Sequence, residues 1–354
     1  MDENINNICK NSLKYSYYNI SKVLAIGDIH GDIKLLKNIL KKNNIITKIQ
    51  QNSNEFVLID NIKYYVPIQK NYIVIQVGDQ LDGYRPGSSN EIDQNFKNDD
   101  IEVYKLMDKL FQITDNYNKT YNCNYHIISL IGNHEIMNII GQYNYAVKNS
   151  TQKNNKNREK IIYNNNIINS MLCFRAFVVT VNDKLLFSHA GLVVRYIKNI
   201  MTPEIYNLFV NTTSFNEKFK IFNIYCLNFL HTLTKNNKLS KKYKFTHNDK
   251  KIYDLVGHRE FNINNKKLCN EANKTINDLK LNHLDNMIIG HNIVNNINTR
   301  KCNKINITNI DVGASRAFEQ YSTFYNTKIP KAILFTFNSN NKYTTQNIMV
   351  IETN

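Results

Sequence analysis

The sequence predicts an α/β fold, because short apolar runs alternate with longer segments that have helical periodicity. Five runs of four to six residues are rich in Val, Ile and Leu and are too short to be helices: VLAI (23–26), IVIQV (73–77), HIISLI (126–131), KLLFS (184–188) and NMIIG (286–290). Between them lie three segments with helical spacing of apolar residues: IKLLKNILKK (33–42), IEVYKLMDKLF (101–111) and EANKTINDLKL (271–281). Strands that alternate with helices are typical of an α/β protein.

The chain length favours one large domain. The 354 residues can bury a substantial core, and they contain no convincing internal repeat and no Pro- or Gly-rich linker. We therefore expect an N-terminal extension over residues 1–21 and a single domain over residues 22–350. The Leu/Phe/Tyr-rich region at about 195–255 predicts a helical insertion, and the polar stretch NSTQKNNKNREK (149–160) predicts an exposed loop.

The chain is strongly basic, with a formal net charge of +16 at pH 7. A basic surface attracts nucleic acid or phosphorylated substrates through long-range electrostatics. The lysines, however, are spread among Asn and Ile residues, and only KLSKKYKF (238–245) is a compact basic run. We interpret most of these charges as solvated faces of a globular protein, which leaves nucleic acid as a less favoured partner.

The cysteine pattern and the absence of long apolar runs predict a soluble cytoplasmic protein. The 6 cysteines include no C-x-x-C pair, so we expect neither a disulfide scaffold nor a cysteine-zinc site, and we expect a reducing compartment. No apolar run approaches the ~18 residues of a membrane span, and the N-terminus lacks a signal-peptide core.

Polar residues able to bind a metal or move a proton follow each predicted strand. GDIHGD (27–32) follows the first strand, GDQLD (78–82) the second and GNHE (132–135) the third, while His189 and His291 follow the last two. Because open α/β sheets gather ligands at the carboxyl ends of their strands, these five ends are predicted to converge on one site.

Other residues of these kinds receive a structural interpretation. Within the first motif, Asp32 has an alternative role as the N-cap of the helix that follows. The remaining histidines have no such placement and are assigned to the core or surface: His126, His231, His247, His258 and His283.

The residue types in these motifs fit a pair of divalent metals. Two metals about 3.5–4 Å apart need a bridging carboxylate, a bridging water and terminal nitrogen or oxygen ligands. The predicted ligands are Asp28 and His30 for one metal, Asp79 as the bridge, and Asn133, His189 and His291 for the other. Mixed ligation without cysteine suits Mn²⁺, with Fe or Zn as alternatives. The site's net charge of roughly +1 would attract a phosphate dianion.

This ordered set of motifs resembles the metal-dependent phosphoprotein phosphatases within the calcineurin-like metallophosphoesterases. The strings LIGNHEIMNIIG (130–141), DLVGHREF (254–261) and IDVGASRAF (310–318) resemble the Shewanella-like branch. The match runs in order from about residue 22 to residue 318. The resemblance implies a central two-sheet β-sandwich flanked by helices, with a helical cap insertion and the metals at the rim of the sandwich.

The resemblance also implies roles for three side chains outside the metal ligands. His134 is expected to protonate the leaving oxygen, Asp82 to orient His134, and Arg259 to bind phosphate oxygens. The first role agrees with the residue type, because a leaving alkoxide needs a general acid and histidine titrates nearest neutrality. The alternative is that Asn133 caps the following helix while His134 packs in the core.

The sequence departs from the family pattern after Asp82. Gly83 stands where the pattern has an arginine, and Arg85 follows two positions later, about 6–7 Å along an extended chain. We predict that Arg85 also binds phosphate; the alternative is that it faces solvent. Gln142 and Asn144 replace the Asp and Arg usual in the Shewanella-like branch.

These features favour a metallophosphoesterase, and the leading hypothesis is a serine/threonine-type protein phosphatase, with phosphotyrosine left open as a further substrate. That enzyme would use a metal-bridging hydroxide as the nucleophile and would act on a phosphorylated protein or peptide. The alternative is the same dimetal chemistry on a dinucleoside polyphosphate or nucleotide. A non-catalytic nucleic-acid-binding protein is a third hypothesis, and the intact ligand set argues against it.

Overall fold

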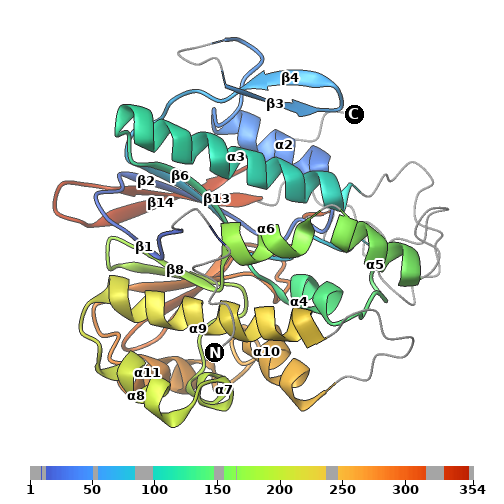
Figure 1. Cartoon of the computed structure of the whole chain (residues 1–354). Helices are drawn as coiled ribbons and strands as arrows, with labels where there is room; N and C mark the ends of the chain where they lie inside the picture. Colours follow the sequence, from blue (N-terminus) through green and yellow to red (C-terminus); the bar gives the residue numbers. More distant parts are fainter. Residues whose placement is uncertain are drawn as a thin grey trace.

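Two mixed β-sheets pack face to face in this protein, and helices cover both outer surfaces (Figure 1). The structure is a computed structural model that describes residues 9, 13–50, 55–83, 99–146, 155–164, 166–236, 246–315 and 331–350. All five predicted strands are present within these residues. The expected α/β architecture with a two-sheet sandwich is therefore confirmed.

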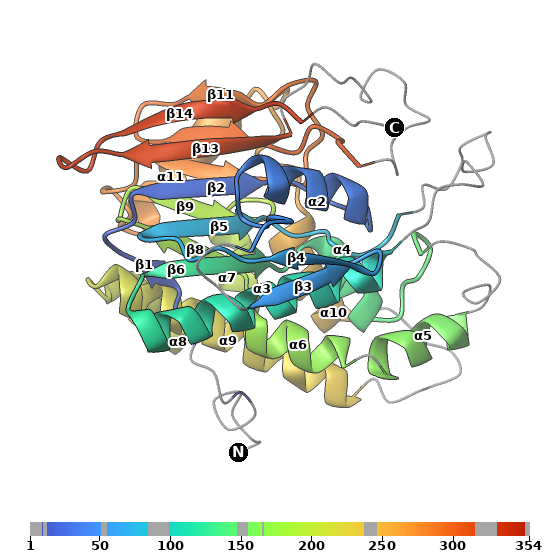
Figure 2. The ribbon, with the colours of Figure 1, turned by 90° about the horizontal axis from the view of Figure 1, so that it is seen from above.

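The first six-stranded sheet carries the motifs from the N-terminal half of the chain. Its order is β14 (Tyr343–Ile348), β13 (Ala332–Phe337), β2 (Lys22–Ile26), β5 (Tyr72–Gln76), β6 (Tyr125–Leu130) and β7 (Arg175–Ala176). The strands from β2 to β7 are parallel, whereas β13 is antiparallel to both of its neighbours. The parallel arrangement brings the ends of β2, β5 and β6 to one edge of the sheet (Figure 2).

The second six-stranded sheet carries the motifs from the C-terminal half. Its order is β1 (Ser16–Tyr17), β8 (Val178–Val181), β9 (Leu185–Ser188), β10 (Asn286–Ile289), β12 (Asn306–Asn309) and β11 (Asn298–Lys301). Strand β1 belongs to the segment expected to be an N-terminal extension, so part of that segment is built into the sandwich. A separate hairpin consists of β3 (Phe56–Ile59) and β4 (Ile62–Tyr65).

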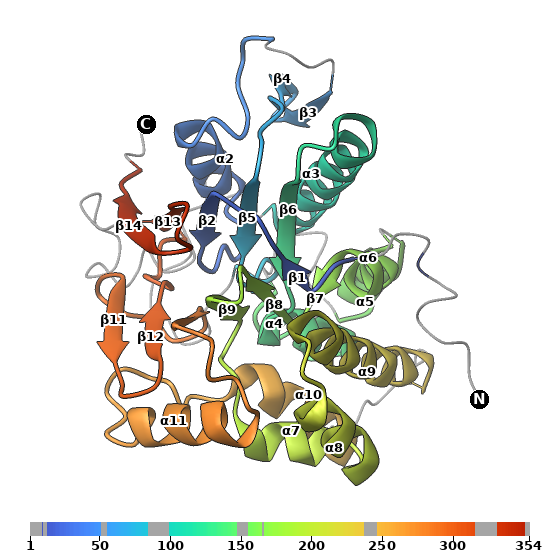
Figure 3. The same ribbon diagram turned by 90° about the vertical axis from the view of Figure 1, so that its left-hand side faces the viewer.

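The helices cover the two outer faces of the sandwich (Figure 3). Helices α2 (Ile33–Lys42) and α3 (Asp100–Tyr121) lie over the first sheet. The expected helical insertion contains α7 (Val194–Ile200), α8 (Pro203–Asn211), α9 (Phe215–Asn236) and α10 (His247–Gly257), which lie with α11 (Leu268–Asp278) on the side of the second sheet. Helices α4 (Asn133–Ile139) and α6 (Ile167–Phe174) complete the described helices together with α5 (Asn155–Asn164).

The alternation of side chains along β2 explains why this strand has helices on one side and a sheet on the other. Val23 and Ala25 point into the core between the two sheets, where Phe187 of β9 also lies. Leu24 and Ile26 belong to a second core together with residues of α2 and α3. A strand buried on both faces reads as a continuous apolar run, as VLAI does.

The prediction of an exposed loop at 149–160 is wrong where the structure describes this segment. Residues 149–154 lie outside the described residues, but helix α5 begins at Asn155, and its Arg158 is only 1% exposed. The polar composition of the segment predicts solvent exposure, whereas Arg158 is buried because it forms ion pairs with buried carboxylates. Local composition cannot indicate such distant partners.

The expectation of no disulfide is also wrong in this structure. Cys9 is bonded to Cys173, 164 residues away, and Cys269 is bonded to Cys302, 33 residues away. Neither separation forms a local spacing motif. Disulfides are typical of oxidising compartments, so the reducing-compartment prediction loses its support.

Two further findings concern membrane-spanning helices and the role of Asp32. In the part of the chain that the structure describes, no helix has the length and apolar character needed to cross a membrane. The side chain of Asp32 accepts a hydrogen bond from the backbone N–H of Leu35 at 3.0 Å, which confirms its role as the N-cap of α2.

Candidate metal centre

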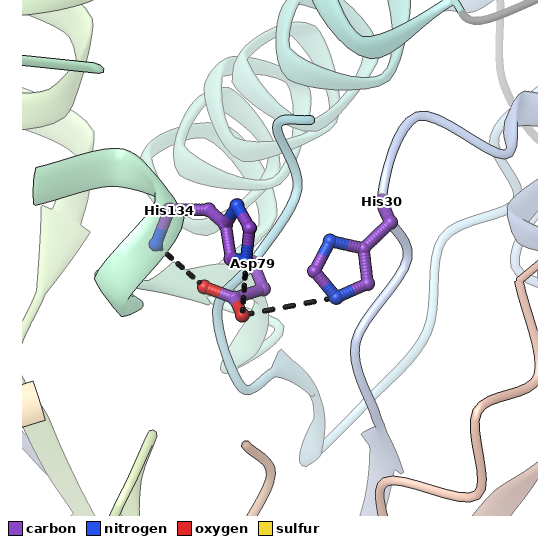
Figure 4. A group of neighbouring side chains, drawn as sticks. All are labelled: His30, Asp79 and His134. Carbon is purple, nitrogen blue, oxygen red and sulfur yellow. Dashed lines mark hydrogen bonds and ion pairs between the residues drawn. The ribbon is translucent and has the colours of Figure 1, made fainter. Parts of the chain in front are cut away.

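Asp79 lies at the centre of the candidate site, in the loop that follows β5. Its carboxylate belongs to two groups of ligand atoms that each lie within 4.8 Å of one another: His30, Asp79 and His134, and Asp79, His189 and His291. Asp79 Oδ2 is 3.7 Å from His30 Nε2 and 3.9 Å from His134 Nε2 (Figure 4). Asp79 Oδ1 is 3.3 Å from His189 Nε2. One buried carboxylate is therefore shared by four buried imidazoles.

The imidazoles of the predicted ligands are oriented by the backbone. Each donates one N–H to a carbonyl: His30 Nδ1 to Asp82 at 3.0 Å, His189 Nδ1 to Val77 at 2.8 Å, and His291 Nε2 to Gly257 at 3.0 Å. Such a bond orients the ring and directs its other nitrogen toward the shared site. Three histidines thus have the backbone support that is typical of metal-ligating imidazoles.

The two remaining predicted ligands also reach this cluster. Asp28 Oδ2 accepts a hydrogen bond from the backbone N–H of His291 at 3.1 Å, and Asn133 Oδ1 lies 3.0 Å from His189 Nε2. A side chain at Gly290 would place its Cβ 2.3 Å from Asp28 Oδ1, so only glycine permits this approach. The structure therefore brings all six sequence-predicted ligands together. His134 joins the first group as well, whereas the five histidines assigned to the core or surface join neither group of the described residues.

Several site residues have a backbone conformation that is rare for residues other than glycine. The φ angles are 48° at His30, 53° at Asp79, 64° at Asp82 and 63° at His291. Left-handed conformations at non-glycine residues are uncommon and cluster at functional sites. They turn the chain sharply after each strand and direct the side chains into the shared site.

Glu135 holds the loop that follows β5. Its carboxylate accepts backbone N–H bonds from Asp79 at 2.8 Å, Gln80 at 2.9 Å, Leu81 at 3.1 Å and Gly132 at 2.8 Å. It connects the GDQLD and GNHE motifs and fixes the position of Asp79. Sequence reasoning assigned no role to Glu135, although its place in a motif at a strand end was the signal.

His134 forms a hydrogen-bonded dyad with Asp82. The His134 Nδ1 atom lies 2.9 Å from Asp82 Oδ2, and both side chains are buried. Burial alone would raise the pKa of Asp82, but the hydrogen bond from His134 and the charge of Arg158 hold that pKa below its ordinary value. Asp82 is thus an anionic acceptor for the imidazole.

The structure does not support the alternative role considered for Asn133. Gly132 occupies the N-cap position of α4, and Asn133 is the first helical residue. The Asn133 side-chain oxygen lies beside His189. The adjacent His134 ring packs edge-on against His30 and Tyr145 while its Nδ1 contacts Asp82.

Asp311 is a further acidic residue of the site that sequence reasoning missed. Burial and the neighbouring carboxylates of Asp311 and Asp79 raise the pKa of Asp28 well above its usual range. The signal was available, because Asp311 stands just after β12 in the same way that the predicted ligands follow their strands. Asp28, Asp79 and Asp311 are three neighbouring buried carboxyl groups that repel one another when ionised, and divalent cations would neutralise this charge.

The two predicted phosphate-binding arginines differ in what the structure describes. Arg259 Nη1 lies 3.4 Å from the backbone oxygen of His291 and 3.4 Å from Asn292 Oδ1, so its guanidinium stands next to a predicted ligand. Arg85 lies outside the described residues.

Comparison with known proteins places the chain in a family. The model of the family "Calcineurin-like phosphoesterase" matches residues 21–303. This chain belongs to the calcineurin-like phosphoesterases. The match confirms the family expected from the ordered motifs and the expected enzyme class, a metallophosphoesterase.

One relative also supports the expected branch. The chain is 32% identical over 146 residues to Shewanella-like protein phosphatase 1 of Plasmodium berghei (strain Anka). This alignment covers 39% of the chain and only 31% of the relative's length.

Two solved structures share the fold across nearly the whole chain. The cold-active protein-tyrosine phosphatase of a psychrophilic Shewanella species has a TM-score of 0.53 and 18% identity, with 96% of this chain and 83% of that chain covered. Another structure of a cold-active protein tyrosine phosphatase has a TM-score of 0.51 and 16% identity, with coverages of 97% and 84%. At these identities the likeness confirms the fold alone.

Proposed function

We propose that this protein is a metal-dependent phosphatase that hydrolyses phosphoserine and phosphothreonine in proteins. The observation that carries the proposal is the Asp79 carboxylate, which is shared by two groups of ligand atoms and lies 3.9 Å from the imidazole of the His134–Asp82 dyad. A metal-binding carboxylate beside an oriented proton donor is the arrangement that hydrolysis of a phosphomonoester needs.

The buried donors suit two divalent metal ions. Asp28, His30 and Asp79 would hold one ion, and Asp79, Asn133, His189 and His291 the other. Bound Mn²⁺, or Fe or Zn, would supply an activated water and stabilise the charge of the phosphoryl group. Imidazoles oriented by backbone carbonyls, together with buried carboxylates and no thiolate among the described ligand groups, fit these metals. The repulsion between Asp28 and Asp311 gives a further reason for a cation here.

His134 is the proposed general acid, and its environment favours a serine or threonine leaving group. Its Nδ1–H is donated to Asp82, so Nε2 faces the Asp79 side of the site. An alkoxide leaves only when it is protonated, whereas a phenolate needs much less assistance. A dedicated acid is therefore most useful for phosphoserine and phosphothreonine.

Arg259 is the proposed phosphate ligand, and Arg85 is proposed as a second one. Arg259 is an exposed residue, and its guanidinium beside His291 can offer two N–H groups to phosphate oxygens. A phosphoprotein substrate is supported by the names of the similar proteins, a Shewanella-like protein phosphatase and a protein-tyrosine phosphatase.

A substrate panel with controlled metal content tests the proposal. Metal-stripped protein should be inactive, and Mn²⁺, Fe²⁺ or Zn²⁺ should restore hydrolysis of p-nitrophenyl phosphate. Phosphoserine and phosphothreonine peptides should then be hydrolysed with a higher kcat/KM than ATP or a dinucleoside polyphosphate. Full activity of stripped protein in excess chelator would contradict the metal site, and a preference for nucleotides would favour the nucleotide hydrolase instead.

A further inference from the structure

Arg158 places a buried positive charge directly behind the His134–Asp82 dyad. Its Nη2 lies 3.1 Å from Asp82 Oδ1 and 2.6 Å from Asp100 Oδ2, and its Nε donates to Asn138 Oδ1 at 2.8 Å. The side chain of Arg158 is 1% exposed, as is that of Asp100, and that of Asp82 is fully buried. Arg158 therefore cannot contact a substrate in solution, and any effect on the reaction must pass through its neighbours.

Two of these neighbours, Asp82 and Asn138, form hydrogen bonds with His134. Asp82 accepts from Arg158 with Oδ1 and from the imidazole of His134 with Oδ2. Asn138 donates from Nδ2 to Asp82 Oδ2 at 2.8 Å and to the backbone oxygen of His134 at 2.9 Å. Arg158 thus fixes both the carboxylate and the amide that surround the imidazole.

We propose that Arg158 is a positioning residue for the general acid, which holds the Asp82 carboxylate in the orientation that receives the Nδ1–H of His134. The proposal rests on the function proposed above for His134. Without Arg158, Oδ1 of Asp82 loses its charged donor, and the carboxylate is held only through the bonds to Oδ2 from His134 and Asn138. The acceptor that sets the tautomer and direction of the imidazole is then less firmly fixed.

The charges in this region explain why a guanidinium is needed. Asp82 and Asp100 are adjacent, since Asp100 Oδ2 accepts the backbone N–H of Asp82 at 3.2 Å. Two buried carboxylates repel each other unless a cation lies between them, and Arg158 contacts both. Its Nη2 contacts both carboxylates while Nε donates to the amide, so one rigid planar group holds three acceptors at fixed angles, which a flexible ammonium group does less well.

A comparison of substrates with different leaving groups distinguishes this positioning role from a role in stabilising the fold alone. Loss of a positioned acid slows esters with poor leaving groups, whereas p-nitrophenyl phosphate needs little protonation. Phenyl phosphate has a similar shape and a poorer leaving group. For metal-loaded Arg158→Gln we expect kcat on phenyl phosphate to fall by about 10–100-fold and kcat on p-nitrophenyl phosphate by less than about threefold, with both KM values nearly unchanged. Arg158→Lys should recover part of the loss.

Arg175→Gln is the matched control. Arg175 is also 1% exposed and forms a 2.6 Å ion pair with Asp108, but its contacts lead to Gln80, Ser170 and Tyr104 and not to the dyad. Its loss should lower Tm to a similar extent and affect the two substrates equally. An unchanged substrate ratio in both Arg158 variants would overturn the proposal. If Arg158→Gln does not fold, the ratio in Arg158→Lys decides.

Two further measurements test whether Arg158 affects the reaction through His134. In a His134→Asn background, Arg158→Lys should cause no additional loss of kcat, and a further loss would overturn the proposal. The Nδ1–H proton resonance of His134, assigned by its absence in His134→Asn, should shift or broaden in Arg158→Lys and stay unchanged in Arg175→Gln. The resonance tests Arg158 even if the wild-type protein hydrolyses no phosphate ester, in which case the proposed function alone fails; an unchanged resonance in Arg158→Lys would refute the positioning role.

Discussion

His134 Nδ1 lies 2.9 Å from Asp82 Oδ2, and this contact joins two motifs whose residues are 52 positions apart in the sequence. The contact fixes the hydrogen on Nδ1 and leaves Nε2 toward the shared carboxylate of Asp79. It therefore connects the proton donor to the predicted metal ligands through one rigid arrangement of three side chains.

Replacing the general acid should separate catalysis from metal binding. His134→Asn removes the proton donor but none of the six predicted ligands, so it should retain metal while kcat falls by roughly 10²–10⁴-fold. The loss should be smaller for p-nitrophenyl phosphate than for a phosphoserine peptide. Metal analysis beside steady-state kinetics checks this, and loss of metal from His134→Asn would show that His134 is a ligand.

Replacing the shared carboxylate should abolish both properties together. Asp79→Asn removes the negative charge common to the two ligand groups, so metal content and activity should fall in parallel. The control is Asp60→Asn, which removes an exposed carboxylate that pairs only with Lys37 among the described contacts. A metal-replete Asp79→Asn enzyme would contradict the bridging role.

The two arginines should differ in a measurable way if only one of them binds phosphate. A hydrogen bond between charged groups is worth about 1.5–3 kcal/mol, so Arg259→Ala should lower kcat/KM by roughly ten- to a hundredfold and weaken inhibition by phosphate in parallel. Arg195→Ala, which removes an exposed guanidinium that contacts Glu260 and Tyr196, should have little effect.

Arg85→Ala decides the role of the displaced arginine. If Arg85 binds phosphate, its loss should resemble that of Arg259 at both low and moderate salt. If it faces solvent, kcat/KM should equal the wild-type value at moderate salt, where weak electrostatic steering is screened. Kinetics at two ionic strengths distinguish these outcomes.

The metal-free protein should become more stable when Asp28 loses its charge. The pKa of Asp28 is raised by burial and by Asp311 and Asp79. A carboxyl with a raised pKa in the fold stabilises it below the unfolded pKa of about 3.9, and this contribution is lost as pH rises through the folded pKa. In chelator, Asp28→Asn should therefore raise Tm at pH 7, with a difference that vanishes toward acidic pH. A lower Tm at pH 7 would contradict the charge repulsion; added metal should stabilise only the wild type.

The two disulfides should contribute to stability. Closing the 33-residue separation between Cys269 and Cys302 restricts the unfolded chain, which corresponds to roughly 3–4 kcal/mol in the chain-entropy model. A reducing agent or Cys269→Ser should lower Tm, and Cys226→Ser, at a buried free thiol, provides a control that leaves both disulfides intact. Equal Tm with and without reductant would show that the pairs do not form in solution.

The sequence alone determined the strands and the residues at their ends. VLAI, IVIQV and HIISLI became β2, β5 and β6 because short β-branched runs are apolar on both faces and are bounded by turn residues. Parallel strands end at one edge of a sheet, so local order along the chain was enough to predict that Asp28, Asp79 and Asn133 would meet. The same rule applied to β12 could have found Asp311.

Only the tertiary structure decided which charged and sulfur-containing groups are buried against each other. Arg158 lies in a polar segment that reads as solvent-exposed, yet it is buried because Asp82, 76 positions away, and Asp100 supply its counter-charges. Cys9 and Cys173 are paired across 164 residues. Burial of a charge or a thiol depends on partners in space, and their distance along the chain leaves no periodic or local signal. Folding of the two sheets against each other brings those partners together.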